Sequence, residues 1–254
     1  MLLAIDIGNT NITLAIFKKD KIISTFRLTT NSQRTSDEYG SFILTFIQSS
    51  GIKSEDIEDI IISTVVPKIM YSFNNAIYKY LKKEPIIIGP GIKTGISLKI
   101  ENPKSLGGDR LVDAVGAYNL YGGPCIAIDF GTATTFDIVD ENGTFIGGAT
   151  APGIGISTNA LSNMAAQLPE ISIRKPKSII GKNTISSMQA GVVYGYIGLT
   201  EKIITELKKE YGSDLKVIST GGLGKIISNE TDLIDTYDQE LTFKGLKIIY
   251  DLNK

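Results

Sequence analysis

The sequence predicts an α/β protein made of two similar halves, each with a mixed β-sheet flanked by helices. Residues 4–8 read AIDIG and residues 127–131 read AIDFG, four identities in five at an offset of 123 residues. Each copy opens a set of three short apolar strands, and helices alternate with strands after the first set. Such self-similarity indicates duplicated domains.

The first half begins with apolar runs separated by turn residues, which predict an antiparallel meander over residues 2–7, 11–17 and 21–28. The remainder alternates helices and strands: a helix over 36–48, a buried strand over 60–66, an amphipathic helix over 68–82 and a short strand over 85–89.

The second half repeats this pattern, with strands expected over residues 125–130, 134–139 and 143–149 and a hairpin turn at 140–143. Glycine pairs at 147–148 and in the segment 152–155 are expected to form tight turns after a strand. Three further elements complete the chain: one long helix or two stacked ones over 183–209, a strand into a glycine turn over 218–222 and a final helix over 239–252.

The composition excludes several classes of function. A net charge of −1 and a pI near 5.7 argue against a protein that mainly binds duplex nucleic acid, because that binding draws on clustered Lys and Arg. The chain has no histidine, which excludes a Ser-His-Asp triad, a His-liganded zinc site and an imidazole general base. Apolar runs fall short of the roughly 20 residues of a membrane span, and no export leader is visible. We therefore expect a cytoplasmic protein without membrane or nucleic-acid partners.

The first candidate site is the turn Asp6-Ile7-Gly8-Asn9-Thr10-Asn11. Gly8 is able to adopt a positive φ, which would let backbone N–H groups approach a phosphate. Because a bare carboxylate repels phosphate, the useful role of Asp6 is to hold Mg²⁺ directly or through water. The alternative is an ordinary hairpin turn, in which Asp, Gly and Asn are frequent for local reasons.

A second copy of this turn, residues 129–135, places three threonines beside another Asp-x-Gly. Threonine is also a good strand residue, so the hydroxyl groups alone are weak evidence. The presence of the turn at both equivalent positions favours phosphate binding.

A third candidate lies between the halves, where Gly107 and Gly108 expose backbone beside an acid and a base at the start of a helix. Asp109 is able to accept a proton from a hydroxyl group, and Arg110 to pair with a substrate anion or with charge on a transferred phosphoryl group. The alternative is that Asp109 caps the helix and Arg110 forms a surface ion pair.

Taken in order, these motifs resemble those of the type III pantothenate kinase family. The matching set is DIGNT at 6–10, VVP at 65–67, NP at 102–103, GGDR at 107–110, DFGTA at 129–133, GG at 147–148, PG at 152–153, NT at 183–184 and QAG at 189–191. The family belongs to the acetate and sugar kinase, Hsp70 and actin superfamily. The resemblance therefore implies two ribonuclease-H-like domains, residues 1–120 and 121–254, with an ATP cleft between them.

The resemblance also implies phosphorylation of pantothenate by ATP, the first step of coenzyme A synthesis, by an enzyme that is a homodimer. The implied nucleotide-binding residues are Asp6, Ile7, Gly8, Asn9, Thr10, Asn11, Ile12, Thr13 and Thr132, with Asp6 near Mg²⁺. The implied pantothenate-binding residues are Gly107, Gly108, Asp109, Arg110 and Thr184, with Asp109 as the catalytic proton acceptor. Asp129 would bind a monovalent cation, K⁺ or NH₄⁺.

Two positions depart from the family pattern: Gly108 stands where the family usually has Ala, and Ile100 where it usually has Tyr. Loss of the Tyr hydroxyl leaves open a kinase for another small hydroxylated acid. A second alternative is a non-catalytic regulator on the same scaffold. The presence of Asp6, Asp109 and Asp129 argues against it. An Hsp70-like or actin-like machine is disfavoured because no segment remains for a peptide-binding domain or polymer contacts.

Overall fold

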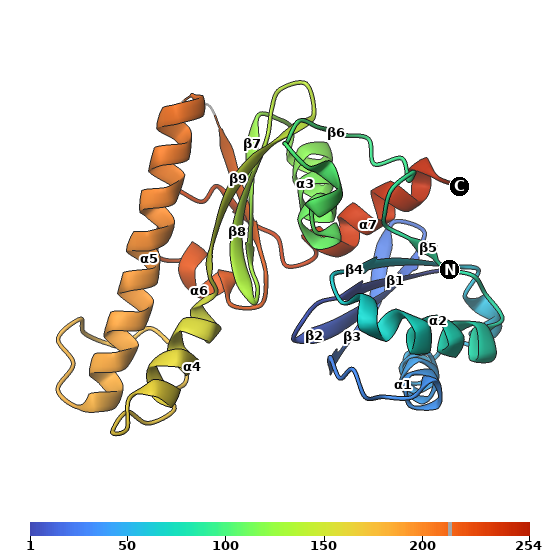
Figure 1. Ribbon diagram of the computed structural model, residues 1–254, viewed down its shortest axis with the longest axis horizontal. Coiled ribbons are helices and arrows are strands. Elements are labelled where there is room, and N and C mark those ends of the chain that lie inside the picture. Colours follow the sequence, from blue (N-terminus) through green and yellow to red (C-terminus); the bar gives the residue numbers. More distant parts are fainter. Residues whose placement is uncertain (213–214) are drawn as a thin grey trace. The chain divides into compact units, whose positions relative to one another are not determined.

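The computed structural model describes residues 1–212 and 215–254, and the chain divides into two compact units (Figure 1). Unit 1 comprises Met1–Gly95, Lys104–Gly116 and Thr242–Lys254, and unit 2 comprises Ile96–Pro103 and Ala117–Leu241. Each unit is thus assembled from segments that are separated in the sequence. Among the described residues, no helix is long and apolar enough to cross a membrane.

The sheet of unit 1 has the strand order β3-β2-β1-β4-β5. Its strands are β1 (Leu2–Ile7), β2 (Asn11–Lys18), β3 (Lys21–Thr29), β4 (Asp59–Thr64) and β5 (Ile86–Ile87). The first three pair antiparallel, which confirms the predicted meander, while β4 is parallel to β1 and β5 is parallel to β4. Parallel pairing requires a crossover, and α1 (Ser36–Ser49) with η1 (Ser54–Asp56) and α2 (Pro67–Leu81) provide the two connections.

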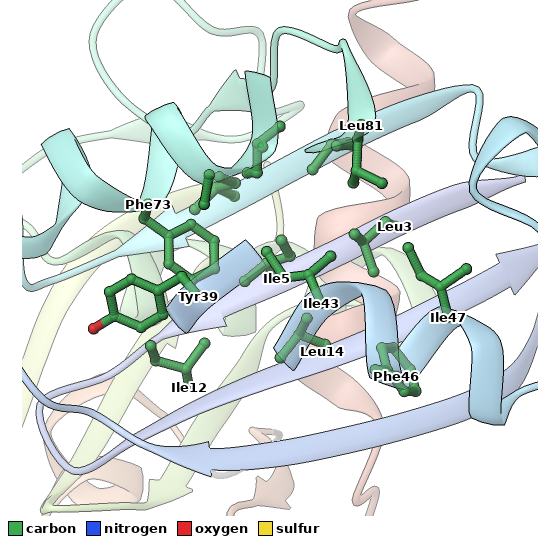
Figure 2. Packing of buried hydrophobic residues seen from close by; sticks show 14 of the residues in the cluster. Leu3, Ile5, Ile12, Leu14, Tyr39, Ile43, Phe46, Ile47, Phe73 and Leu81 are labelled. Carbon is green, nitrogen blue, oxygen red and sulfur yellow. The ribbon is translucent and has the colours of Figure 1, made fainter. Parts of the chain in front are cut away.

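One face of this sheet packs on α1 and α2. Leu3 and Ile5 of β1 alternate inward and meet Tyr39 of α1 and Phe73 of α2, whose ring centroids lie 5.0 Å apart (Figure 2). The opposite face carries the even-numbered residues of β1, including Asp6. In unit 1 this leaves Asp6 outside the apolar core that its strand neighbours build.

Helix α7 (Leu241–Leu252) adds to unit 1 from the far end of the sequence. The Tyr250 hydroxyl donates to Asp59 Oδ2 at the start of β4, and a Cβ at Gly245 would lie 2.2 Å from the Val112 carbonyl oxygen. Glycine at this position therefore allows α7 to approach the first part of α3 (Gly108–Tyr121) closely.

The sheet of unit 2 has the order β11-β10-β7-β8-β9-β6. Its strands are β6 (Ser97–Leu98), β7 (Cys125–Phe130), β8 (Ala133–Val139), β9 (Thr144–Pro152), β10 (Lys216–Thr220) and β11 (Thr236–Tyr237). Read as β9-β8-β7-β10-β11, it repeats the order and the parallel or antiparallel sense of every pair in unit 1. The predicted α/β class with duplicated mixed sheets is confirmed.

Two expectations for the glycine segments are wrong. Gly147 and Gly148 lie inside β9, at a register shift, and a Cβ at Gly148 would lie 1.8 Å from the Phe136 carbonyl oxygen of β8. Close strand approach, not a terminal turn, therefore requires this glycine. The second segment does not turn back either, because Gly153 is the N-cap of α4 (Ile154–Met164).

The remaining elements are α5 (Thr184–Tyr211), α6 (Gly224–Ser228) and η2 (Pro103–Ser105). The long apolar pattern over 183–209 is a single helix, capped by the Asn183 side chain, which accepts from the Ser186 N–H at 2.9 Å. The predicted final helix is α7, which begins two residues later than expected.

Candidate active site

The turn between β1 and β2 is held by two hydrogen bonds. The Gly8 N–H donates to the Asn11 carbonyl at 3.0 Å, and the Thr30 hydroxyl donates to the Gly8 carbonyl at 2.6 Å. Gly8 does not adopt the positive φ that is open to a glycine, since it is not among the glycines with a positive φ. A Cβ there would lie 3.2 Å from the Asn11 oxygen, so close approach across the turn favours glycine.

The other residues of this turn differ in what they expose. Ile7 and Ile12 are fully buried in the apolar core of unit 1, so only their backbone atoms remain for a ligand. Asn9 and Thr10 lie exposed at the tip, and Thr13 is half-buried on the face that carries Asp6. A ligand of this turn would meet polar side chains and backbone N–H groups.

Asp6 and Ser63 are opposed across the parallel pair β1 and β4. Asp6 Oδ1 and Ser63 Oγ are buried, and neither has a hydrogen-bond partner within residues 1–212 and 215–254. Burial of the carboxyl group, and secondarily the charge of Asp109, raises the pKa of Asp6 to about 7, which the nearby Ser63 hydroxyl opposes only in part. An unpartnered oxygen on a carboxylate beside a second carboxylate is an arrangement that a cation would satisfy.

The GGDR motif begins α3. Gly107 precedes the first turn, since its carbonyl accepts from the Leu111 N–H at 3.1 Å, and Asp109 lies inside that turn. The alternative that Asp109 caps the helix is therefore wrong; its Oδ1 accepts from the Arg110 N–H at 2.7 Å. A Cβ at Gly107 would lie 2.5 Å from Asp109 Oδ1, so the bare glycine leaves room for this carboxylate.

Asp129 is the penultimate residue of β7, as Asp6 is of β1. It lies opposite Thr135 of β8 and Thr220 of β10. A Cβ at Gly131 would lie 2.7 Å from Asp129 Oδ2, and one at Gly221, whose φ is +94°, would lie 2.6 Å from Oδ1. Glycine backbone therefore borders both carboxylate oxygens. Thr135 Oγ1 is a further buried oxygen with no partner in the described part of the chain.

Thr132 occupies the tip of the second turn, which packs on the residue before α4. Its carbonyl accepts from the Gly153 N–H at 3.1 Å, and a Cβ at Gly153 would lie 2.3 Å from that oxygen. Farther along, the hydroxyl groups of Thr134 and Tyr196 share a hydrogen bond, and the Tyr196 hydroxyl also reaches the Pro152 carbonyl at 2.8 Å. These contacts fix the turn against α5.

Thr184 lies away from the other residues described in unit 2. It is twelve residues before Tyr196 in α5, about 18 Å along the helix axis at the usual rise. There it lines a pocket of about 780 Å³ formed by α4, the segment before α5 and the first turns of α5. The pocket lining is Leu161, Leu168, Gly181, Lys182, Asn183, Thr184, Ser187, Met188, Gly191 and Val192.

Unit 1 thus brings together two motifs that are far apart in the sequence, the Asp6 turn and the start of α3. Ser63, which was not predicted as a site residue, lies next to both motifs: it is opposite Asp6, and a Cβ at Gly108 would be 3.1 Å from its Oγ. The available signal was a serine in an otherwise apolar strand that pairs in parallel with the Asp6 strand.

Two sheets of one strand order, each with an aspartate next to the end of its first strand and beside a glycine turn, define a duplicated α/β fold with equivalent polar turns in the two units. Solved structures share the fold. A 2-dehydro-3-deoxygalactonokinase from Sinorhizobium meliloti has a TM-score of 0.63 at 14% identity, covering 98% of this chain and 96% of that one. A structure from Campylobacter jejuni described as a Baf family transcriptional activator has a TM-score of 0.60 at 22% identity, covering 99% and 98%.

The chain belongs to the type III pantothenate kinase family, whose model matches residues 2–206. It is 57% identical over 251 residues to the type III pantothenate kinase of Agathobacter rectalis. The aligned residues cover 98% of this chain and 96% of that protein.

Proposed function

We propose that this chain transfers the γ-phosphoryl group of ATP to the hydroxyl group of pantothenate, giving 4′-phosphopantothenate for coenzyme A biosynthesis. Family membership supports the reaction. The observation that carries the proposal is the pair of carboxylates in unit 1, where Asp109 lies near enough to raise the pKa of the buried Asp6. Phosphoryl transfer to an alcohol needs one acidic group for a metal ion and one for the alcohol proton, and the pair provides both.

The residues of the two motifs have separate roles in this proposal. Asp109 orients the pantothenate hydroxyl and accepts its proton late in a loose transition state, while Arg110 stabilises charge on the transferred group. Gly107 and Gly108 offer backbone to pantothenate, and Thr184 binds it as well. Residues 6–13 and Thr132 bind the nucleotide, the former through the N–H groups and polar side chains of the β1–β2 turn.

Mg²⁺ fits the Asp6 position. Within the described ranges no three His, Cys, Asp or Glu side chains gather as a complete metal site. Mg²⁺ in kinases is usually held by one or two carboxylates together with substrate phosphates and water. Asp6 Oδ1 is a buried oxygen that has no hydrogen-bond partner among the residues described. When bound there, the ion would neutralise charge on the phosphate oxygens.

A monovalent cation, K⁺ or NH₄⁺, fits Asp129. The carboxylate is bordered on both sides by glycine, at Gly131 and Gly221, where a side chain would collide with its oxygens. The space is therefore kept free of Cβ atoms beside a negative charge and the hydroxyl of Thr135. The duplicated aspartates would thus hold different ions.

We further propose a cytoplasmic homodimer. Exposed apolar side chains gather in unit 2 on α4, before α5 and at its start: Ile156, Leu161, Met164, Ile179, Ile180 and Ile185. Several exposed apolar side chains in one part of the chain are typical of a protein interface. Analytical ultracentrifugation tests the dimer, and charged substitutions at Met164 and Ile180 should give monomers.

The test of function is ATP-dependent phosphorylation of pantothenate, followed by coupled ADP release with product identified by mass spectrometry. Asp109→Asn should keep the wild-type melting temperature and lose about 10²- to 10⁴-fold in kcat, as expected for loss of a general base. A panel of other small hydroxylated acids tests the alternative substrate that Ile100 leaves open. Turnover of another acid in preference to pantothenate, or a fully active Asp109→Asn, would overturn the corresponding assignment.

A further inference from the structure

A row of four residues crosses the sheet of unit 1 at the level of Asp6. Strand register places Ser63 opposite Asp6, Asp6 opposite Thr13 and Thr13 opposite Arg27. Directly opposed residues on neighbouring strands project from the same face of a sheet. Since strands lie about 4.8 Å apart, the Arg27 Cα is roughly 10 Å from the Asp6 Cα, with Thr13 between them.

Arg27 is exposed on the edge strand β3. In the part of the chain that the structure describes, its guanidinium has no acidic, aromatic or carbonyl partner. Arg34, a few residues on, is different: it donates to the Thr29 carbonyl at 2.7 Å and lies 4.8 Å from the Phe42 ring centroid. Arg34 thus contacts other groups of the protein, whereas within residues 1–212 and 215–254 the Arg27 guanidinium contacts none.

The equivalent row of unit 2 consists of Thr220, Asp129, Thr135 and Thr150. The burial also matches, since Ser63 and Thr220 are buried and Arg27 and Thr150 are exposed. Only the row of unit 1 ends in a positive charge. That row also has a second carboxylate, Asp109, next to it. Two negative charges repel a polyanion more strongly than one, so a nearby positive charge matters more here than in unit 2.

We propose that Arg27 binds the terminal phosphoryl groups of ATP, on the side of Thr13 that faces away from Asp6. The guanidinium fork matches phosphate oxygens in a way that a lysine ammonium does not. An extended arginine directed along the row brings the charge over Thr13, beside the β1–β2 turn. This inference rests on the proposed function, because it takes that turn as the phosphate site.

Steady-state kinetics of Arg27→Ala and Arg27→Lys test the proposal in the full chain. Lys21→Ala is the matched control, because Lys21 is an exposed cation on the same strand. We expect Arg27→Ala to lose about 10- to 100-fold in kcat/KM for ATP, the range of a charge-assisted hydrogen bond. The KM for pantothenate should stay within about twofold, Arg27→Lys should recover part of the loss, and Lys21→Ala should match wild type.

A second readout does not need activity. The thermal shift that Mg-ATP produces should fall in Arg27→Ala relative to wild type, while the shift produced by adenosine should not change. Equal kcat/KM for ATP in Arg27→Ala and Lys21→Ala, or losses that are equal for both substrates and accompanied by a lower Tm, would overturn the role of Arg27. A wild-type protein that shifts with Mg-ATP but does not phosphorylate pantothenate would instead overturn the proposed function.

Discussion

Near the end of β1, the environment of the Asp6 carboxylate is set by two side chains, Ser63 and Asp109, and by a glycine, Gly108. Asp6 and Ser63 face each other across β1 and β4, Asp109 approaches from α3, and Gly108 leaves the space that Ser63 Oγ occupies. Burying two polar oxygens without partners is costly. Without a metal ion, protonation of Asp6 lowers this cost, because the neutral carboxyl group is easier to bury than the charged one. A bound cation would stabilise the charged form instead.

Asp6→Asn should therefore stabilise the metal-free protein at high pH. Asp6 has a pKa of about 7 in the folded protein, against an ordinary value of 3.8. The folded state therefore holds the proton more tightly, and the free energy of unfolding falls as pH rises from about 4 through 7. This difference of about three units sets an upper limit of about 4 kcal/mol. We expect Asp6→Asn to raise the free energy of unfolding by about 1–3 kcal/mol at pH 8.5. This is below the upper limit because Asp6 as a whole residue is half-buried, so that solvent screens part of the effect.

Urea denaturation in EDTA at several pH values measures this effect. The gain should disappear near pH 4, where the wild-type carboxyl group is protonated in both states. A stability difference that does not change with pH would contradict the raised pKa. Added Mg-ATP should stabilise the wild type more than Asp6→Asn, because only the wild type retains the carboxylate.

The departure at Gly108 should be coupled to Ser63. Alanine in the first turn of a helix gains up to about 1 kcal/mol over glycine, but here its Cβ would lie 3.1 Å from Ser63 Oγ. Gly108→Ala should therefore gain less in the wild type than in the Ser63→Ala background, by about 0.5–1 kcal/mol in a double-mutant cycle. Additive effects in thermal or urea unfolding would show that the two sites do not contact each other.

At the scale of elements, local pattern accounts for most of the strands and helices. The apolar runs of β1, β2, β3 and β7 were predicted within one or two residues, since each is bounded by turn residues. The bulge in β9 was not, because Gly148 is required by the Phe136 backbone of another strand. Ser63 and Arg27 were missed for the same reason: their position beside Asp6 and Thr13 depends on strand register, which the sequence of one strand does not contain.

A glycine packed against a neighbouring strand and a glycine on an exposed helix face should respond oppositely to substitution by alanine. Gly148→Ala should lower the free energy of unfolding by about 2–4 kcal/mol, because its Cβ would overlap the Phe136 carbonyl and push β8 away from β9. Gly198→Ala is the control: it is exposed in α5, no atom lies within 4 Å of its Cβ position, and it should gain up to about 1 kcal/mol. Chemical denaturation of both variants measures the difference, and a wild-type stability for Gly148→Ala would exclude the close approach.

At the scale of the whole molecule, duplication has kept the sheet and changed the residues at its corresponding ends. Asp6 and Asp129 are the penultimate residues of the same strand of the repeat, yet the first has another carboxylate beside it and the second has glycine on both sides. The loop between strands also differs, since Ile7 pairs with Ile12 whereas Phe130 pairs with Thr134. The two copies are therefore suited to different ligands, although their strand order is the same.

If the copies hold different ions, the two metal requirements should separate by mutation. Wild-type activity should rise about tenfold or more when K⁺ replaces Na⁺ at constant ionic strength, about 1.4 kcal/mol in the barrier. Asp129→Asn should abolish this response while keeping its dependence on Mg²⁺, because Asp6 is intact. Gly221→Ala should act similarly, since its Cβ would lie 2.6 Å from Asp129 Oδ1. Coupled ADP-release assays across K⁺, NH₄⁺ and Na⁺ measure the response, and a K⁺ effect that persists in Asp129→Asn would place the monovalent cation elsewhere.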